Sequence, residues 1–189
     1  TELYPAAIDP RARRLASDRL NQAYDVCRRL GINRMVVHSG YVPFVYFKEW
    51  HREHSIEFWQ EFMKDKSSNF HIYVENVLED EPYMLLEMMK QIDNPHIKLC
   101  LDIGHANATT SPELPVEKWI EVLGPHIGHF HLHNNDGTGD SHSAFDCGSM
   151  NMDSIFSAID TFFDADVTLT IEARDARACL YWLEKNNYL

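Results

Sequence analysis

The stretch Ile127-Gly-His-Phe-His-Leu-His133 alternates between apolar and imidazole side chains along most of its length. In an extended chain Phe130 and Leu132 point to one face, and the histidines point to the other. This period of two indicates a strand with one face packed in a core. The other face must lie where imidazoles find partners, because a buried polar group without one is costly. The stretch therefore predicts a strand that carries ionisable groups into a shared site.

Four other segments repeat this alternation, namely residues 34–39, 71–76, 98–103 and 167–173. In the second of them, Ile72 and Val74 fall opposite Tyr73 and Glu75. An open doubly wound sheet would be apolar on both faces. Polar residues on one face, near the carboxyl end of each strand, instead indicate the interior and rim of a barrel.

Amphipathic helical patterns alternate with these strands. Asp9 and Pro10 are typical of a helix start, and Gly31 is typical of the end of that helix. Further helices are expected over residues 56–63, 84–89, 115–124, 153–163 and 176–184. Strand–helix alternation at this spacing predicts parallel βαβ units and an α/β fold.

The predicted barrel is incomplete, because a (β/α)8 TIM barrel has eight strands and only five are found. Five parallel strands left open would have two unpaired edges, which is unfavourable. The chain also begins with a loop and a helix rather than a strand. We therefore expect residues 1–189 to form a single, partial TIM-barrel domain that lacks about the first three βα units.

The formal charge of −12, from 29 acidic and 17 basic residues, counts against a nucleic-acid partner. Only Arg11, Arg13 and Arg14 cluster, and this cluster is typical of a solvated helix face. No apolar run approaches the ~18 residues of a membrane span, and no charged-then-apolar leader is visible. Four widely spaced cysteines without a CxxC pair favour a reducing, cytoplasmic location. Association into a homo-oligomer stays open.

Ionisable side chains stand at or just beyond the carboxyl end of every predicted strand, where the strands of a barrel converge. Carboxylates together with imidazoles suit a divalent ion such as zinc, manganese, cobalt or iron better than calcium, and magnesium stays open. One to three ions are expected. The candidate metal ligands are His38, Glu75, Asp102, His105, His131, Asp140, His142 and Glu172.

Each candidate has a simpler explanation when it is taken alone. Asp102 could cap the next helix, His38 could be a hydrogen-bonded core histidine, and Glu172 could be half of an ion pair. Asp140 and His142 could be ordinary loop residues. Burying so many ionisable groups without a cation would be costly, so their coincidence on all five strands favours the metal site.

Other residues beside these ligands have less certain roles. His129 should lie deeper in the barrel and is expected to be structural. His133 could contact substrate, or it could orient a metal ligand. In the aromatic run at residues 41–50, Phe44, Tyr46 and Trp50 could line a pocket mouth or pack the loop against the barrel.

The order of the motifs resembles the xylose-isomerase-like TIM barrels, which include sugar phosphate isomerases/epimerases and endonuclease-IV-like enzymes. Nearly the whole chain takes part in the resemblance. In such barrels the first motif resembles the fourth strand, which implies three earlier strands and a further histidine ligand from the third. The motifs are Val37-His-Ser-Gly40, Val74-Glu-Asn-Val77, Leu101-Asp-Ile-Gly-His-Ala106, His129-Phe-His-Leu-His133 with Asp140-Ser-His142, and Thr170-Ile-Glu-Ala173.

One position departs from the pattern. Asn134 and Asn135 stand where many relatives have an Asp-Asn pair, which puts the hydrogen bonding beyond His131 in doubt.

The isomerase/epimerase pattern implies a single metal ion held by Glu75, Asp102, His131 and Glu172. His105, and in our interpretation His133, would contact a sugar or sugar phosphate. Glu75 and Glu172 would be the catalytic residues, which exchange a substrate proton through an enediolate. The acidic charge favours this function, because it suits a small substrate better than a nucleic acid.

The endonuclease-IV-like pattern adds His38, His105, Asp140 and His142, which would hold a cluster of up to three ions. Such a site hydrolyses a phosphoester, at abasic DNA or in a small molecule. A non-catalytic metal-binding subunit is the third hypothesis.

Overall fold

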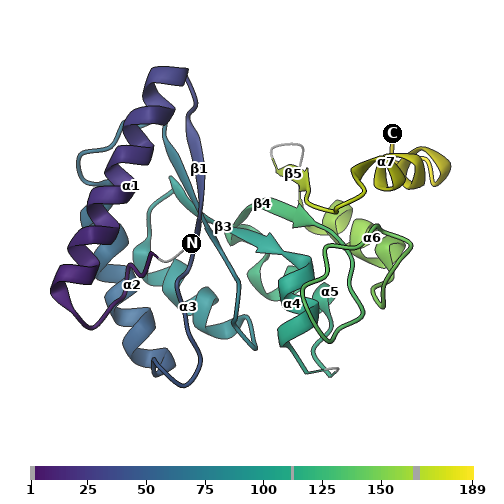
Figure 1. Ribbon diagram of the computed structural model, residues 1–189, viewed down its shortest axis with the longest axis horizontal. Coiled ribbons are helices and arrows are strands. Elements are labelled where there is room, and N and C mark those ends of the chain that lie inside the picture. Colours follow the sequence, from purple (N-terminus) through teal and green to yellow (C-terminus); the bar gives the residue numbers. More distant parts are fainter. Residues whose placement is uncertain (1–2, 112, 164–166) are drawn as a thin grey trace.

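The computed structural model describes residues 3–111, 113–163 and 167–189. These residues contain one curled, open sheet with the strand order β1-β2-β3-β4-β5 (Figure 1). All neighbouring strands are parallel, so each strand pairs with the next in sequence, as in a (β/α) barrel. The strands are β1 (Arg34–His38), β2 (His71–Glu75), β3 (Ile97–Asp102), β4 (Ile127–Leu132) and β5 (Thr168–Ile171).

This topology confirms the predicted α/β fold and the partial barrel. Within the described ranges, β1 and β5 each have one strand neighbour, so the sheet does not close on itself. No helix in these ranges is both long enough and apolar enough to span a membrane.

Helices connect successive strands and pack on one another as a layer: α2 lies against α3, α3 against α5, and α5 against α6 (Figure 1). A short 3-10 helix, η1 (Gly124–His126), leads into β4. The α-helices are α1 (Pro10–Leu30), α2 (Lys48–Met63), α3 (Tyr83–Ile92), α4 (Ile103–Thr109), α5 (Val116–Leu123), α6 (Met152–Phe162) and α7 (Ala176–Lys185).

The boundaries of α1 follow from its sequence. The side chain of Asp9 accepts a hydrogen bond from the backbone N–H of Arg11, which caps the helix start. Gly31 ends the helix in the left-handed conformation, with φ of 71°, where a side chain would be strained.

Two helix predictions need correction. α2 begins at Lys48, about two turns before the predicted start near Ser55, whose hydroxyl is hydrogen bonded to His51 inside the helix. The sequence showed no capping residue at the true start, and the structure has no side-chain cap there either. The short helix α4 was not predicted, because it begins directly at the end of β3, where Asp102 caps it.

The core lies between the sheet and the helix layer. The outward-facing strand residues Ile72, Val74, Leu101 and Phe130 are fully buried there, as the alternation predicts. Because the apolar face of each central strand packs on helices, the polar face is left to line the inner side of the curled sheet. The chemistry of the chain is therefore concentrated on that side.

β5 differs from this pattern. It ends at Ile171, before the predicted limit at residue 173, and its outward residue Leu169 is 47% exposed. In Figure 1, α7 lies to the side of β5 rather than over it. The prediction that the apolar face of this strand is buried was therefore wrong at Leu169.

The aromatic run after β1 divides between the two expected roles. The ring of Trp50 stacks on His54 at 3.7 Å, and Tyr46 packs near His51 at 5.9 Å, so these side chains fix the loop. Phe44 and Phe47 are exposed, and together with Tyr46 they help to line a hollow of about 670 Å³ at the protein surface.

Candidate metal centre

Strand register brings the predicted ligands together at the carboxyl ends of the strands. His38 pairs with Glu75 across β1 and β2, and Asp102 pairs with His131 across β3 and β4. A register irregularity between Leu99 and Cys100 sets this second alignment. Parallel strands end at the same edge, so side chains from distant parts of the sequence become neighbours.

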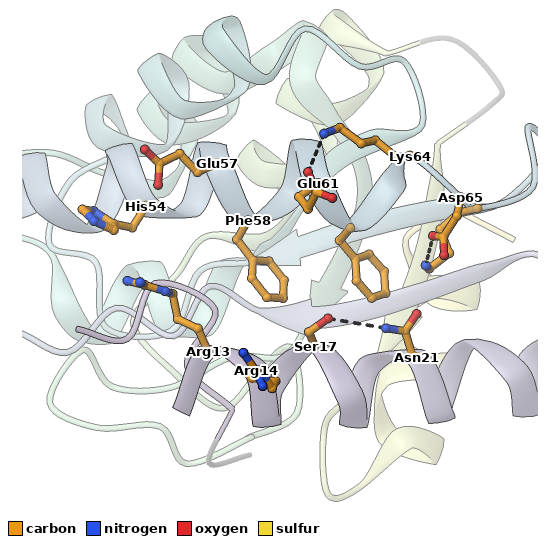
Figure 2. A pocket seen from close by; sticks show the side chains of 12 residues that line it. Arg13, Arg14, Ser17, Asn21, His54, Glu57, Phe58, Glu61, Lys64 and Asp65 are labelled. Atoms are coloured by element: carbon orange, nitrogen blue, oxygen red, sulfur yellow. Dashed lines mark hydrogen bonds and ion pairs between the residues drawn. The ribbon is translucent and has the colours of Figure 1, made fainter. Parts of the chain in front are cut away.

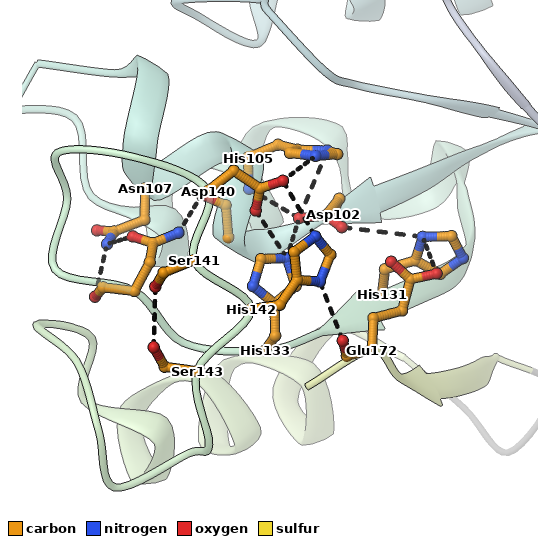
Figure 3. A network of polar contacts seen from close by, with 12 residues as sticks. Asp102, His105, Asn107, His131, His133, Asp140, Ser141, His142, Ser143 and Glu172 are labelled. Carbon is orange, nitrogen blue, oxygen red and sulfur yellow. Dashed lines mark hydrogen bonds and ion pairs between the residues drawn. The ribbon is translucent and has the colours of Figure 1, made fainter. Parts of the chain in front are cut away.

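Glu75, Asp102 and His131 form what we call the first ligand group. One ligand atom from each lies within 4.8 Å of the others. Nδ1 of His131 is 3.3 Å from Oε1 of Glu75 and 3.8 Å from Oδ2 of Asp102. Oε1 of Glu172 also lies 3.3 Å from this nitrogen (Figure 3). Three carboxylates therefore surround one imidazole nitrogen.

Two atoms of the first ligand group are buried without a hydrogen-bond partner among the described residues, Oδ2 of Asp102 and Nδ1 of His131. Unpaired buried polar atoms are rare in folded proteins and call for an explanation. A divalent ion accepts electron pairs from both carboxylate and imidazole. The chemistry of these donors therefore fits a divalent metal ion.

The electrostatics of the first ligand group agree with this fit. Burial alone would lower the pKa of His131, but the neighbouring carboxylates of Glu75, Glu172 and Asp102 outweigh it and raise the pKa. The same carboxylates that hold a proton on the ring would attract a cation in its place. The three carboxylates thus favour a positive charge at this site.

His105, Asp140 and His142 form the second ligand group, whose ligand atoms also lie within 4.8 Å of one another (Figure 3). Nδ1 of His105 donates to the carbonyl of Asn76 at 2.9 Å, and Nδ1 of His142 donates to the carbonyl of Glu172 at 3.0 Å. A carbonyl only accepts, so each Nδ1 carries a proton, and Nε2 is the ring nitrogen that could bind an ion in place of a proton.

Both of these Nε2 atoms face one carboxylate. Oδ2 of Asp140 lies 3.3 Å from Nε2 of His105 and 3.0 Å from Nε2 of His142. Two imidazole nitrogens and a carboxylate directed to one place are a donor set that suits zinc or manganese once an ion replaces the protons between them. The second ligand group can therefore hold an ion beside the first.

Asp102 contributes to both the helix cap and the first ligand group. Its Oδ1 accepts from the backbone N–H of His105 at 2.7 Å and from Nε2 of His133 at 3.1 Å. Its Oδ2 stays free and points to the first ligand group. Burial would raise the pKa of Asp102, but the hydrogen bond from His133 and the charge of His105 lower it. The two roles that the sequence offers for Asp102, helix cap and metal ligand, are thus compatible.

His38 lies at the edge of the site. Its Nε2 is 3.7 Å from Oε2 of Glu75, and about a third of its side chain is exposed. Burial lowers its pKa more than Glu75 raises it. His38 is therefore adjacent to the first ligand group but does not belong to either group in this geometry.

His129 has the structural position that was predicted for it. Its ring nitrogens are hydrogen bonded to the hydroxyls of Thr168, at 2.7 Å, and Thr170, at 3.0 Å. Burial lowers the pKa of His129 to about 4 and raises the pKa of the adjacent Cys100 thiol. Cys100, His129 and His131 lie close together, but His129 with these partners and Cys100 with a protonated thiol are poor metal ligands.

His133 is fully buried, with its ring stacked on His142 at 4.0 Å. Its Nε2 contacts Asp102 rather than open space. This geometry fits the second of the two predicted roles, in which His133 orients a ligand.

Sequence reasoning missed two residues that build the site. The amide of Asn76 joins β2 to β3, because its Nδ2 donates to the carbonyl of Asp102 at 2.9 Å and its Oδ1 accepts from the N–H of Asp102 at 2.8 Å. Glu79 is also buried, and its carboxylate accepts from the hydroxyl of Ser39 and from backbone N–H groups of Val77 and Leu78. Both lie in loops, where no periodicity marks them.

A separate hollow of about 550 Å³ lies between α1 and α2, in the outer helix layer (Figure 2). Its described lining contains charges of both signs, such as Arg13, Arg14, Glu57 and Asp65, and none of the candidate ligands. It is therefore distinct from the metal centre.

Comparison with known proteins agrees with this architecture. The family model for xylose isomerase-like TIM barrels matches residues 3–186. The chain belongs to this family. An uncharacterized protein of Methanocaldococcus jannaschii, MJ1311, is 27% identical over 199 residues, which cover 94% of this chain and 63% of that relative. A second uncharacterized protein of the same organism is 24% identical, and the chain spans 59% of its length.

Solved structures of an epimerase-like protein and of an endonuclease have the same fold as this chain. A D-tagatose 3-epimerase-like protein superposes with a TM-score of 0.81 at 25% identity, over 100% of this chain and 73% of that one. An AP endonuclease, family 2, from Brucella melitensis superposes with a TM-score of 0.74 at 16% identity, over 95% and 70%. Both an epimerase-like protein and an endonuclease are thus among the structures that this chain resembles.

Proposed function

We propose that this chain carries the metal centre of a sugar or sugar-phosphate isomerase or epimerase. The observation that supports the proposal best is the arrangement of Glu75 and Glu172, whose Oε1 atoms each lie 3.3 Å from Nδ1 of His131. The carboxylates come from β2 and from the end of β5, so a small substrate between them would meet one on each side. Proton exchange at one carbon needs a base and an acid on opposite sides of it, and two such carboxylates could fill these roles.

In this proposal a bound divalent ion supplies a Lewis acid that polarises the substrate oxygens. One glutamate removes the proton from the carbon beside the carbonyl group, the C–H electron pair becomes the C=C bond of an enediolate, and the carbonyl π pair moves to its oxygen. The other glutamate returns a proton to complete the exchange. His131 and Asp102 would hold the ion, while His133 keeps Asp102 oriented.

The charge of the chain supports a small substrate. With a net charge of −12, the surface would repel a phosphate backbone rather than attract it. The likeness to a D-tagatose 3-epimerase-like protein is consistent with this proposal.

Phosphoester hydrolysis is the second candidate, and the second ligand group favours it. His105, Asp140 and His142 can hold another ion next to the first ligand group. Neighbouring ions stabilise both the attacking and the leaving oxygen of a phosphoester, which proton exchange does not require. The likeness to an AP endonuclease, family 2, agrees with this alternative.

Two assays on the same preparation separate these functions. The chain is loaded with Mn²⁺ or Zn²⁺ and incubated in D₂O with a panel of ketoses and their phosphates, and deuterium in the recovered sugar is measured by mass spectrometry. In parallel, it is incubated with duplex DNA that contains an abasic site. We expect deuterium incorporation that Glu172→Gln abolishes, and no DNA cleavage.

The opposite results would overturn the proposal. No exchange across the panel, together with strand cleavage that is lost in Glu172→Gln, would assign the hydrolase. A metal-loaded chain that is inactive in both assays would instead support a non-catalytic metal-binding subunit. Glu113→Gln is the matched control, because Glu113 is exposed and belongs to neither ligand group.

A further inference from the structure

The segment at residues 136–150 leaves the end of β4, carries Asp140 and His142 to the metal centre, and returns to α6. It contains no helix or strand of its own, so side chains must fix its path. Two consecutive residues at its base, Asn134 and Asn135, are buried and make most of the bonds that do so.

Asn134 closes the base of the segment. Its backbone exchanges two hydrogen bonds with Ser143, at 2.9 and 2.8 Å, in an antiparallel bridge. Its side-chain Nδ2 donates to the carbonyls of Phe145, at 2.8 Å, and Met150, at 3.1 Å. Its Oδ1 accepts from the backbone N–H groups of Asn135 and Met150. The amide therefore uses both its donor and its acceptor end.

Asn135 ties the same segment to α4, which carries His105. Its Nδ2 donates to the carbonyl of Gly104 at 2.7 Å, while its Oδ1 accepts from Asn107 at 2.6 Å and from the N–H of Gly137 at 3.0 Å. The buried amides of Asn134 and Asn135 thus connect α4, which carries His105, to the segment 136–150, which carries Asp140 and His142.

We infer that Asn134 and Asn135 are positioning residues, which hold the segment 136–150 so that Asp140 and His142 meet His105 and form a second ion site. This inference rests on the metal centre, which both candidate functions share, and extends it to the residues that assemble the second ligand group. It also gives a physical reason for Asn at position 134. A carboxylate there would set negative oxygens against the carbonyls of Phe145 and Met150 and could donate to neither.

Two substitutions of different chemistry disturb this anchor. Asn134→Asp removes the donor. Gly148→Ala adds a Cβ that would overlap the side-chain oxygen of Asn134, without a change of charge. Each has a matched control: Asn33→Asp adds the same charge at an exposed residue outside the site, and Gly139→Ala adds a Cβ within the same segment where nothing lies within 4 Å.

The first measurement is hydrogen–deuterium exchange in the metal-free chain. We expect the amides of Gly137, Ser143, Ser149 and Met150, which are hydrogen bonded at the anchor, to exchange at least about tenfold faster in Asn134→Asp and Gly148→Ala. The two controls should match the parent chain. Unchanged exchange in both test variants would overturn the inference.

The second measurement is titration with Co²⁺, followed by its absorption spectrum and by the number of ions retained per chain. The parent chain and the controls should bind two ions. Asn134→Asp and Gly148→Ala should keep the first and bind the second at least about tenfold more weakly. Equal second-ion affinity in the variants, despite faster exchange, would also overturn the inference.

The two measurements separate this inference from the proposed function. Proton exchange on a sugar could fail while the two-ion pattern and its dependence on the anchor persist, which would leave the positioning role intact. If the parent chain binds only one ion although its segment 136–150 is already protected from exchange, the second ion site itself is overturned.

Discussion

Nε2 of His133 lies 3.1 Å from Oδ1 of Asp102, and neither side chain is accessible to solvent. A buried carboxylate with one oxygen fixed in this way has the other oxygen aimed in a defined direction, here toward His131. A residue that contacts no ion can therefore control how well an ion is held.

This contact predicts the effect of His133→Ala. The substitution leaves Oδ1 of Asp102 with only the backbone N–H of His105, so the carboxylate can rotate away from the first ligand group. We expect the affinity of the first ion to fall about 10–100-fold, as is typical when the partner of a ligand is removed. Isothermal titration with Zn²⁺ measures it. His54→Ala, which removes an imidazole stacked on Trp50, is the control, and equal affinities in the two variants would refute the prediction.

The contact between His133 and Asp102 also requires glycine at position 104. A Cβ at this position would overlap the ring of His133, which lies against the first turn of α4. Gly104→Ala should therefore displace the ring and lower the free energy of unfolding by about 1–3 kcal/mol, the usual range for overpacking. Urea denaturation measures this change. Gly139→Ala should stay close to the parent chain, and a Gly104→Ala protein of parental stability would show that the ring moves freely.

Glu79 offers a test away from the candidate ligands. Its buried carboxylate accepts hydrogen bonds from the hydroxyl of Ser39 and from two backbone N–H groups, and burial raises its pKa. Glu79→Ala would leave these buried donors unsatisfied, at a cost of about 1–3 kcal/mol for each group that water cannot reach. We expect a large fall in the midpoint of thermal unfolding. The exposed Glu113→Ala should change it little, and a similar midpoint in both variants would contradict this account.

The sequence could predict the strands, and which side chains gather at their carboxyl ends as candidate ligands, for a local reason. An alternating pattern such as Ile72 to Glu75 indicates which side chains share a face. Parallel strands bring their carboxyl ends, and the side chains there, to one edge of the sheet. Asp102 was recognised both as a helix cap and as a ligand, and the structure shows that one carboxylate makes the cap while its free oxygen faces the first ligand group.

The division into two ligand groups could not be predicted, because it depends on contacts between residues far apart in sequence. The free nitrogen of His105 is selected by the carbonyl of Asn76, and that of His142 by the carbonyl of Glu172. No spacing within one segment encodes either contact. The early start of α2 was missed for another reason, since Phe47 provides no capping side chain.

His51 predicts how the stability of the fold depends on pH. It is fully buried in α2, and burial lowers its pKa from 6.5 to about 4. Between these values the unfolded chain binds a proton that the folded chain does not, so stability falls as the pH is lowered. The loss amounts to about 3 kcal/mol by pH 4, at about 1.4 kcal/mol per pH unit.

The test compares the metal-free parent chain with His51→Leu by urea denaturation at pH 7 and at pH 4.5. Leucine loses the contact of the ring with Tyr41, which lowers stability equally at both pH values, but it cannot take up a proton. The parent chain should therefore lose more stability than the variant on acidification, by about 2–3 kcal/mol. His51→Gln, which is neutral but polar, should share the weaker dependence. If all three proteins lose the same free energy, His51 is not the group that couples protons to unfolding, because removing its titration would then have changed nothing.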